Sequence, residues 1–283
     1  MRIILRKNDS ATSLLLFIYN NYMVLTGEES IKLTSLLKFV GVFGKNESAV
    51  RMSLSRATKS GLLTNERKDG DVYYSLTEGG RKAILTWNEG VMQFWKRYRM
   101  RHMGWNGKWY FVNIQSSTEN KETKTLIEDR LQQLGFTIVN SQTWVTPYSQ
   151  NQEIKALVES FDMEDRWIEI YGEMTVHKDQ DAFFDEVFGI QKLSNAYREF
   201  IETFAESFDE TKSLYQDSDF AESGAALPIL HGLGWNFFKI ASEDVVLPKE
   251  ILPQWEGDRA AAMMKEFREI LLPAVNYFLQ KTN

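Results

Sequence analysis

Residues 44–77 read GKNESAVRMSLSRATKSGLLTNERKDGDVYYSLT, and their pattern indicates the fold of the N-terminal part of the chain. Asn46 is a good N-cap at the start of a helical stretch, and Gly61 is a good stop at its end. After the helix, residues alternate on both sides of Asp69-Gly70, which predicts a β-hairpin because Asp-Gly favours the tight turn between two antiparallel strands. A short helix followed by a two-stranded wing indicates a winged helix.

The segments before this stretch complete the domain. Residues 11–24 and 31–43 carry apolar side chains at helical spacing, which predicts two helices ahead of the one that starts at Asn46. Gly41 and Gly44 then mark a tight turn, and two short helices joined by such a turn form a helix-turn-helix. We therefore expect a winged helix-turn-helix domain over residues 1–80.

The helix after Asn46 has one apolar face and one polar face. At 100° per residue, Val50, Leu54 and Ala57 share an inward stripe, with Glu47 near the same side. The opposite arc is basic and rich in hydroxyl groups, so it suits the edges and phosphates of a DNA major groove. The candidate DNA-binding residues are Lys45, Asn46, Ser48, Arg51, Met52, Ser55, Arg56 and Lys59 on this helix, with Arg67 and Lys68 at the tip of the wing.

Charge is divided unequally along the chain. The formal net charge is −6, but residues 1–110 hold 18 Lys and Arg against 9 Asp and Glu, whereas residues 111–283 hold 15 against 30. A basic segment joined to an acidic one is typical of a module for a polyanion attached to a body that is not for one. Chance clustering of solvated charge is the alternative interpretation.

Several classes of chemistry find no support in the sequence. The chain has no cysteine, so we expect no disulfide and no thiolate site, and the three histidines, His102, His177 and His231, are far apart. No catalytic motif, metal-ligand spacing or glycine-rich phosphate loop is present. We therefore expect no enzyme activity, no catalytic residue, no metal and no cofactor. The apolar run in residues 1–10 is too short for a signal peptide and no membrane-spanning stretch occurs, so we expect a cytoplasmic protein.

The middle of the chain alternates between strand and helix patterns. Between residues 105 and 178, the order is strand, helix, strand, strand, helix, strand. This βαββαβ order is the ferredoxin-like arrangement. The sequence therefore predicts an α+β protein whose middle domain is ferredoxin-like.

Two further segments are helical. Residues 81–104 predict a linking helix whose basic end, KRYRMRH, either reaches DNA phosphates or is solvated, and the pattern does not separate the two. Residues 179–283 predict a mainly helical C-terminal domain. An effector pocket at its junction with the middle domain has His231 and Trp235 as weak candidates, because ligand sites favour domain junctions. A core position is the preferred interpretation of Trp235.

Four stretches of the chain together resemble the PaaX family of bacterial transcriptional repressors of phenylacetic acid catabolism. They are FGKNESAVRMSLSRATKSGLL, YYSLTEGGR, GWNGKWYFVNI and LGFTIVNSQTWVTPY, and LPKEILPQWEG near the end resembles the family's C-terminal motif with Glu256 in place of proline. The resemblance implies a middle domain like the Cas2 nuclease fold. It also implies a homodimeric repressor that binds a palindromic operator of catabolic genes and is released by an acyl-CoA effector such as phenylacetyl-CoA.

Two other functions remain as alternatives. A Cas2-like metal-dependent nuclease would use an aspartate after the first strand of the middle domain, but that position is Asn113, which lacks the charge to hold a divalent cation. A winged helix can also serve only for protein contacts, as an adaptor. The expected partners are double-stranded DNA, an acyl-CoA and a second copy of the chain, with no membrane.

Overall fold

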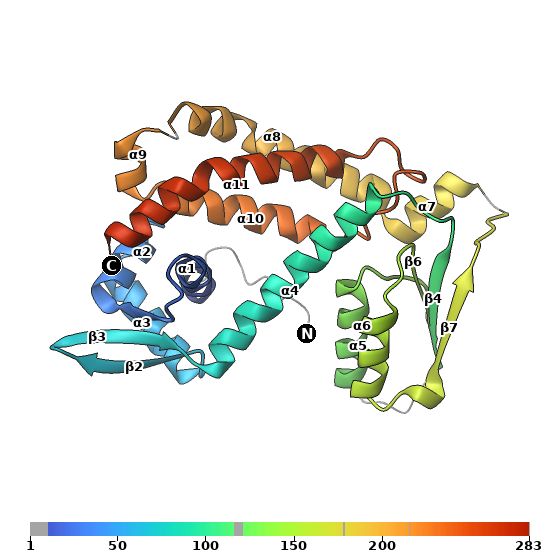
Figure 1. Ribbon diagram of the computed structural model, residues 1–283, viewed down its shortest axis with the longest axis horizontal. Helices are drawn as coiled ribbons and strands as arrows, with labels where there is room; N and C mark the ends of the chain where they lie inside the picture. Colours follow the sequence, from blue (N-terminus) through green and yellow to red (C-terminus); the bar gives the residue numbers. More distant parts are fainter. Residues whose placement is uncertain (1–10, 116–120, 178, 215, 283) are drawn as a thin grey trace. The chain divides into compact units, whose positions relative to one another are not determined.

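The computed structural model describes residues 11–115, 121–177, 179–214 and 216–282, and the chain forms two compact units (Figure 1). Residues 1–10, whose apolar run is too short for a signal peptide, lie outside the described residues. Among the described residues, the winged-helix unit contains those within 11–88, 200–237 and 260–282, and the ferredoxin-like unit contains those within 89–199 and 238–259.

The winged-helix unit has the three helices and the hairpin that the sequence predicts. These are α1 (Ala11–Thr26), α2 (Leu33–Gly41), α3 (Glu47–Lys59), β2 (Leu63–Lys68) and β3 (Asp71–Leu76). A third strand, β1 (Ser30–Lys32), pairs antiparallel with β3, so the sheet order is β1-β3-β2. The sequence did not predict β1, because three residues are too few to show an alternating pattern.

Helices from the C-terminal segment belong to the same unit. They are the last part of α8 (Ile190–Leu214), α9 (Ser218–Ser223), and parts of α10 (Ala226–Ala241) and α11 (Glu256–Lys281). On α11, Phe278 packs edge-on against Phe39 of α2 with ring centroids 5.9 Å apart, and Ser35 Oγ donates a hydrogen bond of 2.9 Å to the carbonyl of Thr282. Residues 179–283 are mainly helical, as predicted, but they are divided between the two compact units.

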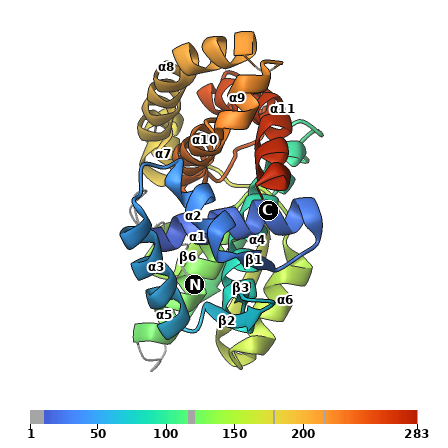
Figure 2. The same ribbon diagram turned by 90° about the vertical axis from the view of Figure 1, so that its left-hand side faces the viewer.

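The ferredoxin-like unit contains a four-stranded antiparallel sheet with the order β5-β6-β4-β7. Its elements follow the predicted βαββαβ order: β4 (Trp109–Ile114), α5 (Lys121–Gln133), β5 (Thr137–Asn140), β6 (Thr143–Thr146), α6 (Asn151–Ser160) and β7 (Trp167–Gly172). The prediction of an α+β fold with a ferredoxin-like middle domain is confirmed. Figure 2, turned by 90°, labels β6, α5 and α6 of this unit.

Both faces of this sheet are covered, but by different parts of the unit. On one face, Val112 and Trp144 form a core with α5 and α6. On the other, Trp109 stacks on Phe184 of α7 (Gln180–Phe188) at 5.9 Å and shares a cluster with Val245. Residues that follow α10 therefore form part of the core of the ferredoxin-like unit.

Candidate nucleic-acid interface

The turn between α2 and α3 sets the direction of the candidate recognition helix α3. Gly44 has a φ of +73°, which favours glycine, and its N–H donates to the carbonyl of Gly41 at 2.9 Å. The Asn46 side chain then accepts a hydrogen bond of 2.9 Å from the N–H of Ala49. This is the geometry of the N-cap that the sequence predicts, and it commits the Asn46 side-chain oxygen Oδ1 to the start of the helix.

The division of α3 into two faces follows the predicted pattern. Val50, Leu54 and Ala57 are buried, together with Ser53, whose hydroxyl donates to the Ala49 carbonyl at 2.8 Å. The predicted outward residues of the helix, Ser48, Arg51, Met52, Ser55, Arg56 and Lys59, are exposed, and Lys45 before the helix is half-buried. The helix therefore presents a basic face with hydroxyl groups, and whether these side chains contact DNA stays a prediction.

Arg51 is not a free cation on this face. Its Nε and Nη2 atoms lie 2.8 Å and 2.6 Å from Glu47 Oε1, one helical turn earlier. Glu47 is exposed, so the expectation that it lies near the inward side was wrong. Its position in the first turn of α3 suits the positive end of the helix dipole, and it also holds the Arg51 guanidinium along the helix surface.

The wing carries its basic residues at the predicted turn. Asp69 and Gly70 have φ values of 51° and 87°, as the two central residues of a type I′ turn require. Arg67 and Lys68 immediately before the turn are exposed. Asp71, after the turn, forms an ion pair of 2.6 Å with Lys32 of β1, a contact that the sequence analysis missed together with the strand.

The basic end of α4 (Glu78–Arg101) was expected either to contact DNA phosphates or to be solvated. Arg97 and Arg101 do neither. Arg97 and Arg101 are buried, at 3% and 1% exposure, so neither reaches phosphates and neither is solvated. Arg97 Nη1 donates to the Gln133 carbonyl at 2.8 Å, and burial lowers the pKa of Arg97 to about 10. A Cβ atom at Gly135 would lie 2.3 Å from Arg97 Cδ, so glycine makes room for this side chain.

Arg101 holds the segment that follows α10. Its guanidinium donates to both carboxylate oxygens of Asp258, at 2.9 and 2.8 Å, and to the carbonyls of Leu247 and Leu252. The spacing of Arg97 and Arg101 from buried Phe94 places all three on one stripe of α4. That spacing could have predicted the burial of both arginines, but arginine is usually exposed, so the sequence was interpreted as a solvent-facing or DNA-facing run.

A buried carboxylate anchors the beginning of this segment. Asp244 Oδ2 accepts hydrogen bonds from the Tyr197 hydroxyl at 2.9 Å and Trp255 Nε1 at 3.3 Å, while Oδ1 accepts from the Val246 N–H at 2.7 Å. Burial raises the pKa of Asp244 in spite of these donors. Val246 has a φ of +63°, which is strained for a β-branched residue, so these bonds hold the backbone in a costly conformation.

The two weak effector candidates lie in the winged-helix unit. His231 of α10 is buried and packs edge-on against Phe17 of α1 at 4.9 Å and Phe43 of the turn before α3 at 5.6 Å. Trp235, one turn along α10, stacks on His231 at 6.3 Å and is half-buried. The sequence could not reveal this contact, because His231 and Phe43 are far apart along the chain.

The residues described give no metal centre. Asn113 Nδ2 donates to Thr143 Oγ1 at 3.1 Å, across the β4 and β6 strands. Within the described ranges, no group of three or more His, Cys, Asp or Glu residues is arranged to hold a metal ion. In the same ranges, no helix is both long enough and apolar enough to span a membrane.

A helix-turn-helix with a wing, followed by a ferredoxin-like domain and helices, defines a multidomain winged-helix protein. The sequence model described as PaaX-like protein matches residues 10–80, and the model described as PaaX protein central Cas2-like domain matches residues 102–183. The chain belongs to the PaaX family, which is a family of DNA-binding transcriptional regulators. This confirms the resemblance found in the sequence.

Structural similarity extends over almost the whole chain. An uncharacterized protein from Mycobacterium tuberculosis, Rv0674, superimposes with a TM-score of 0.64 and 15% sequence identity, covering 96% of this chain and 98% of that one. At this identity the likeness concerns the fold alone. A search among curated proteins found no match.

Proposed function

We propose that this protein is a homodimeric repressor that inserts α3 into the major groove of a palindromic operator near catabolic genes. The observation that carries the proposal is the exposed face of α3, where Arg56 and Lys59 stand beside hydroxyl groups and Arg51 is held by an exposed ion pair with Glu47. Arginine can fork onto guanine and hydroxyls can bond bases or phosphate. Arg67 and Lys68 on the wing then supply phosphate or minor-groove contacts next to the helix.

A mobility-shift titration tests this function. The full-length protein is titrated against DNA from upstream of its own gene and against a scrambled duplex of equal length, at several salt concentrations. A repressor of this kind prefers the upstream DNA and loses affinity steeply with salt, because cations on the protein displace counterions from phosphates. Equal, salt-insensitive binding of both duplexes, or none at any dimer concentration, contradicts the proposal and favours the protein-interaction adaptor.

The homodimer is supported by the outer edge of the ferredoxin-like sheet. Among the strands of the described residues, β7 pairs only with β4, and its side chains Ile168, Ile170 and Tyr171 are 43%, 54% and 57% exposed. An exposed apolar edge strand is a template for pairing with another chain. We propose that two copies join along β7. A palindromic operator places the two half-sites that their α3 helices would read about one turn of DNA, roughly 34 Å, or a multiple of it apart.

Sedimentation analysis of the full-length protein tests the dimer. Ile170→Lys places a charge on the apolar face of β7, so we expect a concentration-dependent shift from dimer to monomer, with weaker operator binding as a consequence. Leu126→Lys introduces the same charge at an exposed apolar position of α5 and serves as the matched control. A variant that remains dimeric at all concentrations contradicts pairing through β7.

An acyl-CoA effector is the remaining part of the proposal. His231 packs against Phe43 in the turn that precedes α3, so a ligand that disturbed α10 would act on the direction of the recognition helix. Coupling of about 1 to 3 kcal/mol weakens operator binding roughly 5- to 150-fold. Phenylacetyl-CoA is titrated into a preformed complex with DNA, with free coenzyme A as control, and release by both compounds equally contradicts acyl recognition.

A further inference from the structure

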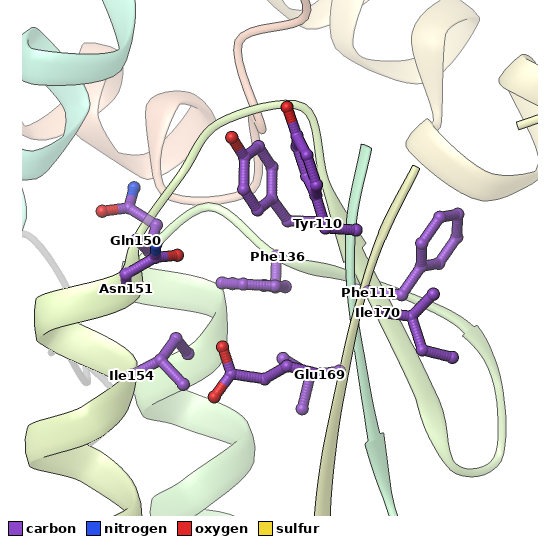
Figure 3. Close-up of a pocket in the computed structure, with 10 residues that line it drawn as sticks. Tyr110, Phe111, Phe136, Gln150, Asn151, Ile154, Glu169 and Ile170 are labelled. Atoms are coloured by element: carbon purple, nitrogen blue, oxygen red, sulfur yellow. The ribbon is translucent and has the colours of Figure 1, made fainter. Parts of the chain in front are cut away.

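A cavity of about 380 Å³ lies between strands β4 and β7 and the beginning of α6, inside the ferredoxin-like unit (Figure 3). Its volume is within the range of small-molecule sites. The side chains of Phe136, Ile154 and Glu169 extend to one side of the strands, where the cavity lies, and those of Phe111 and Ile170 extend to the other side. The cavity therefore belongs to the face of the sheet that α5 and α6 cover.

The floor and one wall of the cavity suit a flat apolar group. Phe136 and Ile154 are 3% and 2% exposed and give an apolar floor. The rings of Tyr110 and Tyr171, neighbours across β4 and β7, lie 4.8 Å apart at 38° and form an aromatic wall. Aromatic groups stack favourably on such rings, so a ligand with a six-membered aromatic ring fits this part of the cavity.

The charge around the cavity disfavours an anion. Glu169 is exposed, its carboxylate points across the cavity towards Ile154, and it forms no ion pair with any residue that the structure describes. None of the residues that line the cavity is Lys, Arg or His. Two cations near the lining are already paired. Lys96 donates to Glu153 at 2.6 Å and to Gln150 at 3.2 Å, and Lys108, near Tyr171, donates to Glu173 at 2.9 Å.

The start of α6 does not offer an alternative anion site. Its first turn already contains the carboxylate of Glu153, which complements the positive end of the helix dipole. Among the described residues, the polar groups at the cavity that form no hydrogen bond are the Glu169 carboxylate, the Asn151 amide and the hydroxyls of Tyr110 and Tyr171. A carboxylate beside an amide can bind an ammonium group, because both supply oxygen acceptors for its N–H groups.

We propose that this cavity binds a small aromatic amine, with its ring on Tyr110, Tyr171 and Phe136 and its ammonium group at Glu169. The site goes beyond the proposed function, because it involves no DNA contact and its charge is opposite to what an acyl-CoA requires. The protein thus has a second ligand class, which it recognises in the ferredoxin-like unit through the charge of a single side chain.

Isothermal titration of the full-length protein without DNA tests the site. Phenethylamine, phenylacetamide and phenylacetate share a ring and a short chain and differ in charge, so they separate ring binding from charge recognition. We expect saturable binding that is about two- to fivefold tighter for phenethylamine than for phenylacetamide, as a partly exposed ion pair provides. We expect phenylacetate and phenylacetyl-CoA to bind more weakly than phenylacetamide.

Variants identify the site and keep the proposal falsifiable. Glu169→Gln removes the charge and should abolish the preference for phenethylamine while leaving phenylacetamide binding unchanged; Tyr171→Ala should weaken both. Glu164→Gln, an exposed acid of the same unit outside the cavity, is the matched control. Tighter binding of phenylacetate, an unchanged preference in Glu169→Gln, or no saturable binding of any probe overturns the proposal. A failure of DNA binding would leave all these results unaffected.

Discussion

Glu47 Oε1 lies 2.6 Å from Arg51 Nη2, so the first cation of the candidate recognition helix is already paired before any DNA is present. Both side chains are more than half exposed, and such surface pairs are weak, at about 0.2 to 1 kcal/mol. DNA can therefore take Arg51 from Glu47 at small cost. Glu47 is then left as an unpaired negative charge beside phosphates.

Glu47→Gln should tighten DNA binding. The change removes this negative charge and frees Arg51, so we expect affinity to rise by about 0.2 to 1 kcal/mol and discrimination between operator and scrambled DNA to fall. Mobility-shift titrations with both duplexes measure the two effects. Glu199→Gln removes the same charge from an exposed position of α8 and should change neither. Weaker binding by Glu47→Gln would mean that Glu47 itself contacts a base.

Arg56→Ala should weaken operator binding more than it affects folding. Arg56 is exposed on α3 and no ion pair of its guanidinium occurs among the described residues. If Arg56 contacts a base, we expect a loss of about 1 to 3 kcal/mol of binding free energy for the operator and none for scrambled DNA. If Arg56 contacts a phosphate, we expect affinity for both duplexes to fall equally, and the slope of log affinity against log salt concentration to be reduced by about 1. Arg268→Ala, an exposed arginine of α11, is the control. Unchanged affinity for every duplex would contradict the role given to this face of α3.

Arg101→Met should reduce the free energy of unfolding much more than Arg99→Met, although both remove a cation from the basic run of α4. Arg101 has no exposed side-chain surface, and its loss leaves Asp258 and two carbonyls without their donor, at a cost of about 3 to 5 kcal/mol. Arg99 is exposed, so its substitution should change the free energy of unfolding by less than about 0.5 kcal/mol. Urea denaturation measures both, and equal losses would contradict the anchoring role of Arg101.

The free energy of unfolding of the wild-type protein should withstand mild acid better than that of the Asp244→Asn variant. Because burial raises the pKa of Asp244 above 3.8 in the folded state, the folded protein takes up this proton before the unfolded chain does. This contribution to stability is fully present below the unfolded pKa and is lost as pH rises through the folded pKa. The difference in unfolding free energy, wild type minus Asp244→Asn, should therefore increase as pH falls from 7 to 4.

Urea denaturation at a series of pH values checks this linkage. Asp209→Asn, which alters an exposed aspartate of α8, should follow the wild type at every pH. A constant difference between wild type and Asp244→Asn would mean that the folded-state pKa of Asp244 is not raised.

The local features of the winged helix could be predicted because short-range interactions determine them. Asn46 caps a helix through an atom three residues away, and Asp69-Gly70 adopts positive φ values within a single turn. The buried stripe of α3, with Val50 and Leu54, follows from helical periodicity alone. The same reasoning predicted βαββαβ in the middle domain, where apolar runs and turns alternate.

Other features depend on partners that are remote in sequence. Arg97 and Arg101 appeared available to phosphates, but Gln133, Leu247 and Asp258 supply acceptors that satisfy them in the interior. A charged side chain is buried only where such acceptors converge, and its own neighbours along the helix do not reveal them.

The winged helix, the order of the ferredoxin-like elements and the outward face of α3 can thus be predicted from local sequence, since capping, turn formation and periodicity act over a few residues. The contact of His231 on α10 with Phe43, and the burial of Arg97 and Arg101 within a basic run, follow from the folded structure and not from local sequence. Burial and hydrogen bonding depend on which distant segments pack together, and the local sequence does not show which segments these are.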